Sequence, residues 1–444
     1  MKGKKVLGVV VASCLAGSLA ACGSPRDSKS GSSSSPAPSA SAGASASPSA
    51  SAAAGKKVEL VWWYSDGKQT DVMNKIAAKF TETHPNIKVT PELTAGDQYY
   101  TKLQTVLAAN SGPDVMWMDG PDFPKFQSKG FLQPYNDLIK KDNFSMDNYP
   151  KSMVDLYSMD GKMYGMPKDF DTIGLYYNKE MFDKAGVKYP DATWTWDTLR
   201  DAAKKLTITS GNNTTQWGFA ATSGTQESIY PILVQNGVKL VSADKKTTDV
   251  GSADGVAAIQ VLYDMMYKDK VSPDGKYMID NKPGALFKSG KVAMMTGGSW
   301  NARGYYDALK EKLDVAVLPK MKQEGNIIHG IGWVMNAKSK NQNEAWEFVK
   351  WLGSKDVAMM QAEVGAVIPA FNGTQDTWVK SLPYNLKVFI DMTKTSTPYP
   401  ISNNVEWEDP IAAHISNIWI DKEKVADGMK AAQDEANKIM AEVK

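Results

Sequence analysis

An α/β fold, with parallel strands covered by helices on both faces, is the fold class that this 444-residue sequence predicts. Three observations predict it. Short apolar segments alternate with amphipathic ones from residue 58 onward, their lengths fit strand–helix–strand units, and the composition (42% hydrophobic, 23% charged) is that of a soluble globular chain. At this length two domains are expected.

The elements follow one another in a regular order. Val58–Trp63 is a compact apolar strand, and a helix then opens at Asp71 and stops before Pro85. The segment 87–89 is the next strand, 99–107 a second helix and 115–118 a third strand, which completes two strand–helix–strand units. Further helices are predicted at Trp196–Leu206, Gly255–Lys268, Asn343–Leu352 and Val425–Val443.

Charge and cysteine content exclude several function classes. Lys and Arg number 51 against 49 Asp and Glu, which gives no reason to expect a nucleic-acid partner. The two cysteines, Cys14 and Cys22, both precede the folded part, so a disulfide framework, a thiolate zinc site and cysteine catalysis are excluded there. The three histidines are far apart in sequence, and we expect neither a metal nor a cofactor.

The first 21 residues have the pattern of a secretory signal peptide. Three lysines are followed by the apolar run Val6–Ala21, whose 16 residues would span about 24 Å as a helix, less than the roughly 30 Å hydrocarbon core. An uncleaved membrane anchor is the alternative. Leu19–Cys22 resembles the bacterial lipobox, which implies cleavage before Cys22, lipidation of its thiol and a location at the cell membrane, facing outward.

Residues 22–55 are predicted to be a lipidated cysteine followed by a flexible tether. Gly23–Gly55 holds 13 Ser, 9 Ala, 4 Pro and 4 Gly, and it has no aromatic or branched aliphatic residue. Such a segment cannot bury a core, so we expect it to hold the folded part away from the membrane.

Candidate ligand contacts follow the first and third strands. In an α/β sheet, ligands bind beyond the carboxyl ends of the strands. Trp63, Tyr64 and Asp66 come at the end of the first strand, and Asp119 and Asp122 at the end of the third. Each carboxylate could instead cap a helix, Asp122 above all, because it precedes a short predicted helix.

Tryptophan is unusually abundant, with 13 copies. Trp346 lies in an amphipathic helix and is expected in the core, whereas Trp300, Trp333 and Trp407 lie in glycine-rich or polar segments, with Glu408 beside the last. An aromatic ring in such a place can stack on the C–H face of a sugar, and a nearby carboxylate can accept from its hydroxyl groups. These residues therefore favour a saccharide ligand.

Three motifs in the middle of the chain, Gly174–Phe182, Ala185–Val187 and Thr195–Leu199, resemble the central signature of extracellular solute-binding proteins of sugar ABC transporters, the maltose-binding-protein-like family. The similarity runs in order through nearly all of residues 58–440 and includes Gly112–Val115, Phe287–Met295 and Ala345–Leu352.

The resemblance implies two α/β lobes, each a mainly parallel sheet flanked by helices, that close on a sugar. The expected N-terminal lobe is 56–169 plus 320–367, and the expected C-terminal lobe is 172–318 plus 368–444. The chain would cross between them near Asp169–Thr172, Leu318–Met321 and Ala366–Pro369.

The resemblance also implies a function and roles for individual residues. It implies a monomer that captures an extracellular mono- or oligosaccharide without catalysis and delivers it to the permease subunits of an ABC importer. Asp171 matches a carboxylate that bonds sugar hydroxyls, and Trp300 and Trp407 match stacking aromatics. Asp122 lies near a family Asp–Arg pair whose arginine is missing here.

Two other function classes remain open from the sequence. Carboxylates beside aromatics also describe an extracellular glycoside hydrolase, although the sequence shows no Gly-x-Ser-x-Gly elbow, P-loop or Gly-x-Gly-x-x-Gly fingerprint. A peptide-binding or adhesion lipoprotein on the same scaffold is the third interpretation, which the aromatic segments favour less.

Overall fold

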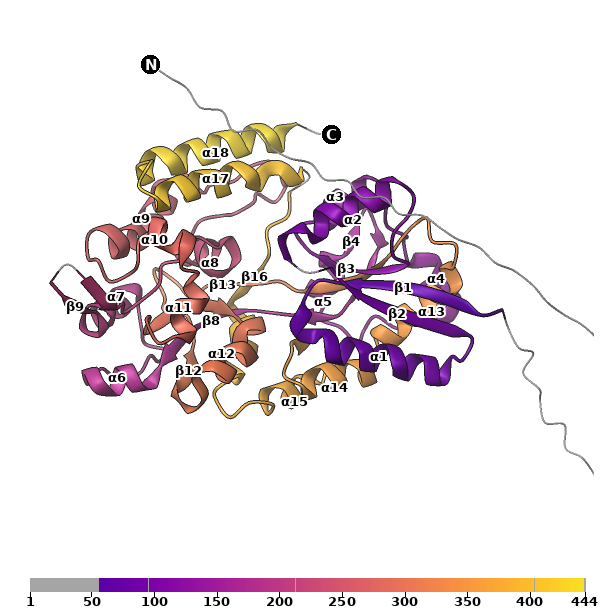
Figure 1. The fold of residues 1–444 in the computed structure, drawn as a ribbon. Coiled ribbons are helices and arrows are strands. Elements are labelled where there is room, and N and C mark those ends of the chain that lie inside the picture. The colour runs from indigo at the N-terminus through magenta and orange to yellow at the C-terminus, as the bar shows by residue number, and fades with distance from the viewer. Residues whose placement is uncertain (1–55, 95, 212, 403, 443–444) are drawn as a thin grey trace, which may run out of the picture. The chain divides into compact units, whose positions relative to one another are not determined.

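The computed structural model describes residues 56–442 apart from residues 95, 212 and 403 (Figure 1). The chain divides into two units, Met1–Ala53 and Ala54–Lys444, and every element below belongs to the second. The predicted signal peptide, Cys22 and the tether lie outside the described residues.

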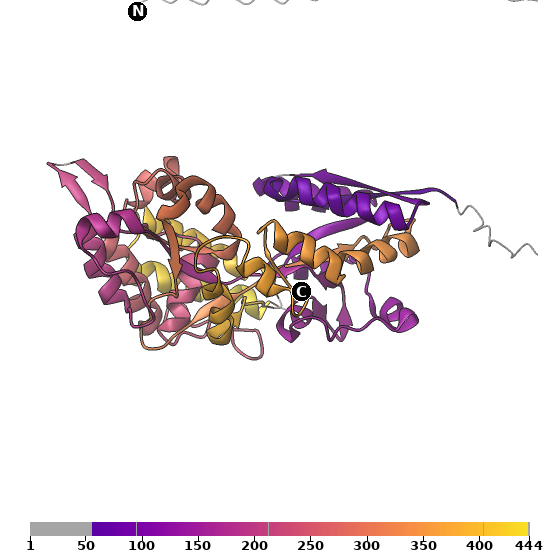
Figure 2. The same cartoon turned by 90° about the horizontal axis from the view of Figure 1, so that it is seen from below.

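A five-stranded sheet forms the first half of the fold, in the strand order β2-β1-β3-β14-β6. β1 (Val58–Tyr64), β2 (Ile87–Leu93) and β3 (Val115–Asp119) are parallel, as the strand–helix–strand pattern predicts. β14 (Ile331–Met335) and β6 (Gly165–Pro167) complete it with antiparallel pairings. Helices α1 (Thr70–Thr83) and α13 (Gln342–Leu352) pack against its strands (Figures 1 and 2).

The second sheet differs from the expected mainly parallel arrangement. Its three strands, in the order β11-β8-β12, are β11 (Met294–Gly298), β8 (Ile173–Asn178) and β12 (Leu313–Ala316), and both pairings are antiparallel. The reason is that β8 begins where the chain arrives from the first sheet and runs away from that point, whereas its two neighbours run back toward it.

Three segments connect the two sheets. β7 (Asp169–Phe170) pairs with β15 (Ile368–Pro369), and Asp171 forms an isolated backbone bridge with His329. β13 (Asn326–Ile328) precedes β14, and Ile327 packs in the core of the second half. The lobe bounds and crossings expected from the sequence stay a prediction.

Helix positions agree closely with the sequence pattern. α7 (Trp196–Leu206) has the predicted bounds, and the Thr195 hydroxyl caps it by accepting from the Thr198 N–H. Four further helices begin and end within two residues of the predicted positions. They are α2 (Tyr99–Ala108), α9 (Ala253–Tyr267), α13 (Gln342–Leu352) and α18 (Val425–Ala441).

The C-terminal helices cover the second core. α17 (Glu408–Trp419) and α18 pack side by side, and α18 also contacts α9 (Figure 1). The other described helices are α3 (Phe123–Ser128), α4 (Asn136–Asp142), α5 (Lys151–Leu156), α6 (Lys179–Ala185), α8 (Tyr230–Gln235), α10 (Gly275–Asp280), α11 (Pro283–Lys288), α12 (Ala302–Leu309), α14 (Lys355–Glu363), α15 (Gln375–Val379) and α16 (Lys387–Asp391). Short strands are β4 (Ser158–Met159), β5 (Lys162–Met163), β9 (Ile208–Ser210), β10 (Asn213–Gln216) and β16 (Ser396–Pro398).

Within the part of the chain that the structure describes, no helix combines the length and the apolar character that crossing a bilayer requires.

Candidate functional site

A cleft of about 290 Å³ lies where the connecting segments meet loops from both sheets. Its volume is close to the lower end of the range for small-molecule sites, roughly 300 Å³. Residues from the first sheet, the second half and the crossings all line it: Asp66, Lys68, Gln69, Trp117, Asp119, Asp169, Phe170, Asp171, Gln226, Ser299, Trp300, His329, Ile331 and Val367.

Four of the ten residues predicted to bind ligand line this cleft: Asp66, Asp119, Asp171 and Trp300. Asp66 also caps the short helix η1 (Gly67–Gln69), where its Oδ1 accepts from the Lys68 N–H at 3.0 Å. Trp300 is half-buried in η4 (Ser299–Asn301), directly after β11. Of the residues predicted to bind ligand, the structure therefore brings one aromatic ring and three carboxylates together from distant parts of the sequence.

The loop after β3 joins two carboxylates. The Asp119 Oδ1 accepts from the Asp122 N–H at 3.0 Å, and burial raises the pKa of Asp119. Asp122 holds the N-cap position of α3, but its side chain makes no capping hydrogen bond there. Burial and the Asp119 charge raise the pKa of Asp122 to about 7. Asp122 is not among the described residues that line the cleft.

Asp171 is the best-connected carboxylate of the cleft. Its Oδ1 accepts from the Gln226 side-chain amide, and its Oδ2 lies 3.5 Å from Nδ1 of His329. Burial raises its pKa, while the interaction with His329 acts in the opposite direction. Two fixed donors hold the carboxylate in one orientation and leave lone pairs for a ligand hydroxyl.

His329 is a site residue that sequence analysis missed. Its Nε2 accepts from the Gly120 N–H at 3.0 Å, which leaves the ring proton on Nδ1, facing Asp171. Its ring also packs edge-on against Tyr399, at 5.4 Å between ring centroids. Burial alone would lower the pKa of His329, but Asp171, with the charges of Asp119 and Asp169, raises it.

His329 thus connects the loop after β3, the first crossing and the second half of the fold. Gly120 is required for this contact, because an added Cβ would lie 2.9 Å from Leu156 Cδ1 and 3.2 Å from the His329 ring. The sequence signal was the segment Gly330–Trp333, from which Ile331 lines the cleft, and His329 precedes this segment directly.

Trp63 and Tyr64, predicted to contact ligand at the end of the first strand, both lie within β1. β1 continues through both residues because they pair with Glu92 and Leu93 of β2. The Trp63 indole is 6% exposed and donates to Glu92 Oε2 at 2.8 Å, and the Tyr64 hydroxyl donates to Thr70. Both side chains are structural in this arrangement.

Trp333 and Trp407 were predicted to present free rings, and both rings are buried. Trp333 lies in β14, fully buried, with its ring centroid 5.0 Å from that of Trp62. Trp407 ends the short helix η7 (Val405–Trp407), and its ring, 2% exposed, belongs to the core beneath α17 and α18. Segments distant in sequence cover both rings, so neither faces the cleft.

Glu408 has a partly structural role. Its Oε1 accepts from the hydroxyl groups of Tyr230 and of Tyr399. Burial raises its pKa, and the charge of Asp119 raises it further. Glu408 therefore lies near the carboxylates of the cleft but is not among the described residues that line it.

The described residues contain no group of three His, Cys, Asp or Glu side chains placed to hold a metal ion. What the cleft offers is a half-buried indole ring beside carboxylate oxygens that are held by neighbouring donors. Such a set suits a neutral ligand with an apolar face and several hydroxyl groups.

Two sheets joined by three crossing segments, with a cleft at the junction, define a two-lobed ligand-binding protein. Residues 66–359 match the family of bacterial extracellular solute-binding proteins, and the chain belongs to this family.

Similar proteins agree with this assignment. The galactooligosaccharide-binding protein of Bacillus subtilis (strain 168) is 26% identical over 368 residues, which cover 80% of this chain and 77% of that protein. The arabinooligosaccharide-binding protein of Halalkalibacterium halodurans is 26% identical and covers 62% of each chain. The structure of an ABC substrate-binding protein from Listeria monocytogenes in complex with cycloalternan superimposes with a TM-score of 0.81 at 26% identity, over 87% of this chain and 99% of that one.

Proposed function

We propose that this protein captures an extracellular mono- or oligosaccharide in the cleft and delivers it to the permease of an ABC importer. The observation that carries the proposal is the position of Trp300 beside Asp171 and Asp119 at the junction of the two lobes. A ring can cover the C–H face of a sugar while the carboxylates accept from its hydroxyl groups. Similar proteins are described as binding arabinooligosaccharide or galactooligosaccharide, or were solved with cycloalternan, which supports this chemistry.

We propose further that the protein binds its ligand without chemical change. Members of its family are binding proteins, and the fixed partners of Asp171 suit it to accept hydrogen bonds from hydroxyl groups. A glycoside hydrolase would instead need one carboxyl group as acid and a second as base or nucleophile on the same bond.

The lobes would consist of residues 56–169 plus 330–367 and of residues 172–328 plus 368–444, with the connecting segments as hinges. We also propose a monomer held at the outer face of the cell membrane through a lipid on Cys22.

A melting-temperature screen of the purified protein against saccharides tests the function. A ligand that binds only the folded state stabilises it by RT ln(1 + [L]/Kd), or about 2.7 kcal/mol at one hundred times Kd. We expect at least one saccharide to raise the melting temperature, and chromatography to recover it unchanged after prolonged incubation. Steady conversion by the purified protein, abolished in Asp171→Asn, would support the hydrolase instead.

A further inference from the structure

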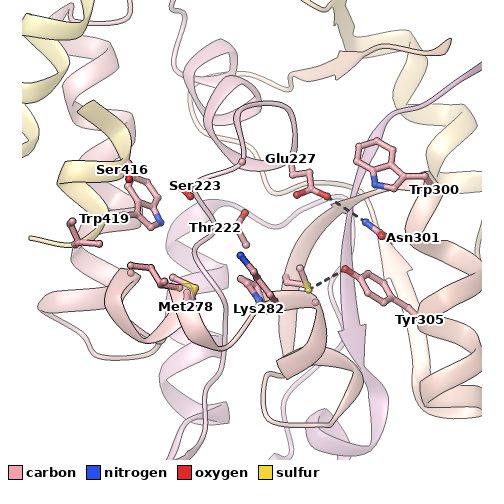
Figure 3. Close-up of a pocket in the computed structure, with 17 residues that line it drawn as sticks. Thr222, Ser223, Glu227, Met278, Lys282, Trp300, Asn301, Tyr305, Ser416 and Trp419 are labelled. Atoms are coloured by element: carbon pink, nitrogen blue, oxygen red, sulfur yellow. Dashed lines mark hydrogen bonds between the residues drawn. The ribbon is translucent and has the colours of Figure 1, made fainter. Parts of the chain in front are cut away.

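A second cavity, of about 440 Å³, is lined by Trp300 together with Glu227, Lys282 and Trp419 (Figure 3). We call it the side pocket. Its wall consists of residues 222–224 and 227 and of some residues from each of the segments 275–284, 295–305 and 416–420. Trp300 lines both the side pocket and the cleft.

Neighbouring residues in two short helical turns line different cavities. In η3 (Thr225–Ile229), Gln226 lines the cleft and Glu227 lines the side pocket. In η4, Ser299 lines the cleft and Asn301 lines the side pocket. The cleft and the larger side pocket therefore adjoin at Trp300 and at these two helical turns.

The wall of the side pocket has the mixed chemistry of a saccharide subsite. Met278 and Trp419 supply apolar surface, and Glu227 accepts from the Asn301 side-chain amide at 3.4 Å (Figure 3). The Trp419 indole N–H is already used, because it donates to the Ala221 carbonyl at 2.8 Å. Among the described residues that line the side pocket, Glu227 has the only carboxylate, and this carboxylate already accepts a hydrogen bond from Asn301.

Lys282 is an exposed residue in the wall of the side pocket, and it gives that wall a positively charged side chain. It immediately precedes α11, and Figure 3 shows its amine directed toward Thr222, apart from the Glu227–Asn301 pair. Among the described residues it forms no ion pair within 4 Å, although many other lysines of this chain do, such as Lys322 with Asp254. Its amine is therefore available to an anionic ligand group.

We propose that the side pocket binds the end unit of an oligosaccharide that crosses Trp300, and that Lys282 selects an end unit that carries a carboxylate, as a uronic acid does. This inference rests on the proposed function and names the substrate class within it. The ligand carboxylate and the Lys282 ammonium form a charge-assisted hydrogen bond, and the remaining hydroxyl groups meet Glu227 and Asn301.

Titration calorimetry on matched saccharides tests the proposal with the whole protein. The probes are di- and trisaccharides in two forms, one ending in a uronic acid and one ending in the parent hexose. We expect the acidic form of the best pair to bind at least tenfold more tightly, and its advantage to shrink as NaCl is raised. Lys282→Met should remove most of the advantage and weaken binding of the neutral form far less.

Lys276→Met is the matched control, because Lys276 is an exposed lysine on the adjacent helix α10 that does not line the side pocket. This variant should keep the acidic preference.

The inference is wrong if neutral and acidic forms bind alike, or if Lys282→Met and Lys276→Met behave alike. Neutral saccharides that bind through Trp300 without any acidic preference would overturn this inference and leave the proposed function standing. If no saccharide binds at all, the proposed function itself fails.

Discussion

The indole ring of Trp300 lies against the α-carbon of Gly298. A Cβ added to Gly298 would come within 1.9 Å of Cζ3 of Trp300, far inside any allowed contact. The turn after β11 therefore places the ring in the cleft only because position 298 has no side chain.

Gly298→Ala should displace the Trp300 ring and weaken saccharide binding by tenfold or more, since the stacking surface moves. Calorimetric titration measures this loss. Gly304→Ala is the control, because an added Cβ at position 304 meets no atom within 4 Å and alanine favours the helix α12 that contains it. Equal affinities of the two variants would show that the position of the ring does not matter for binding.

Asp171→Asn should weaken binding by roughly ten- to a hundredfold, because a hydrogen bond to a charged group contributes about 1.5–3 kcal/mol and about 1.4 kcal/mol is tenfold in Kd. The amide must also turn its NH₂ group toward Gln226 or His329, both of which present donors. Asp155→Asn is the control, as Asp155 is an exposed residue paired with Lys151. Unchanged affinity in Asp171→Asn would remove Asp171 from the site.

The melting temperature of the ligand-free protein should fall as the pH rises from 5 to 7. Asp122 has an ordinary pKa of 3.8 when unfolded and about 7 when folded, so the folded state binds more protons in this interval. Its contribution to stability is complete below about pH 4 and is lost as the pH rises through 7. Asp119, Asp171, Glu227 and Glu408 have raised pKa values and act in the same direction.

Asp122→Asn should flatten this profile and raise the melting temperature at pH 8 relative to the unmodified protein, with little difference at pH 5. Calorimetric melting curves from pH 5 to pH 8 check this. Parallel profiles for the two proteins would mean that Asp122 does not titrate in this interval.

Cys22→Ala should release the protein from the membrane fraction. Cys22 follows a lipobox-like segment, and it is the last of the two cysteines of the sequence. Cell fractionation with a carbonate wash measures the distribution. Retention of the variant in the washed membranes at the level of the unmodified protein would contradict a lipid anchor at this position.

The elements were predictable because their signals are local. The apolar strand at 58–63 and the helix at 196–206 depend on periodicity and a capping threonine within a few residues. The direction of β8 was not predictable in this way, since it depends on where the chain arrives from the other sheet.

The site was predictable only in part for a similar reason. Asp66, Asp119, Asp171 and Trp300 lie at strand ends or at a crossing, which the sequence marks. The flanks of Trp333 and Trp407 resemble those of Trp300, but their surroundings come from distant segments such as Trp62 and α18. His329 depends on Gly120, 209 residues earlier in the chain, and no local pattern reports such a contact.

The most direct test of the saccharide-binding cleft is titration calorimetry of the best saccharide from the screen into Trp300→Ala. Truncating a buried aromatic anchor typically costs about 2 kcal/mol or more, so we expect Kd to rise by more than tenfold, with partial recovery in Trp300→Phe. Trp346→Phe, which alters a core ring that is 2% exposed, should lower the melting temperature and leave Kd nearly unchanged. A folded Trp300→Ala protein that binds the saccharide as tightly as the unmodified protein would contradict the account.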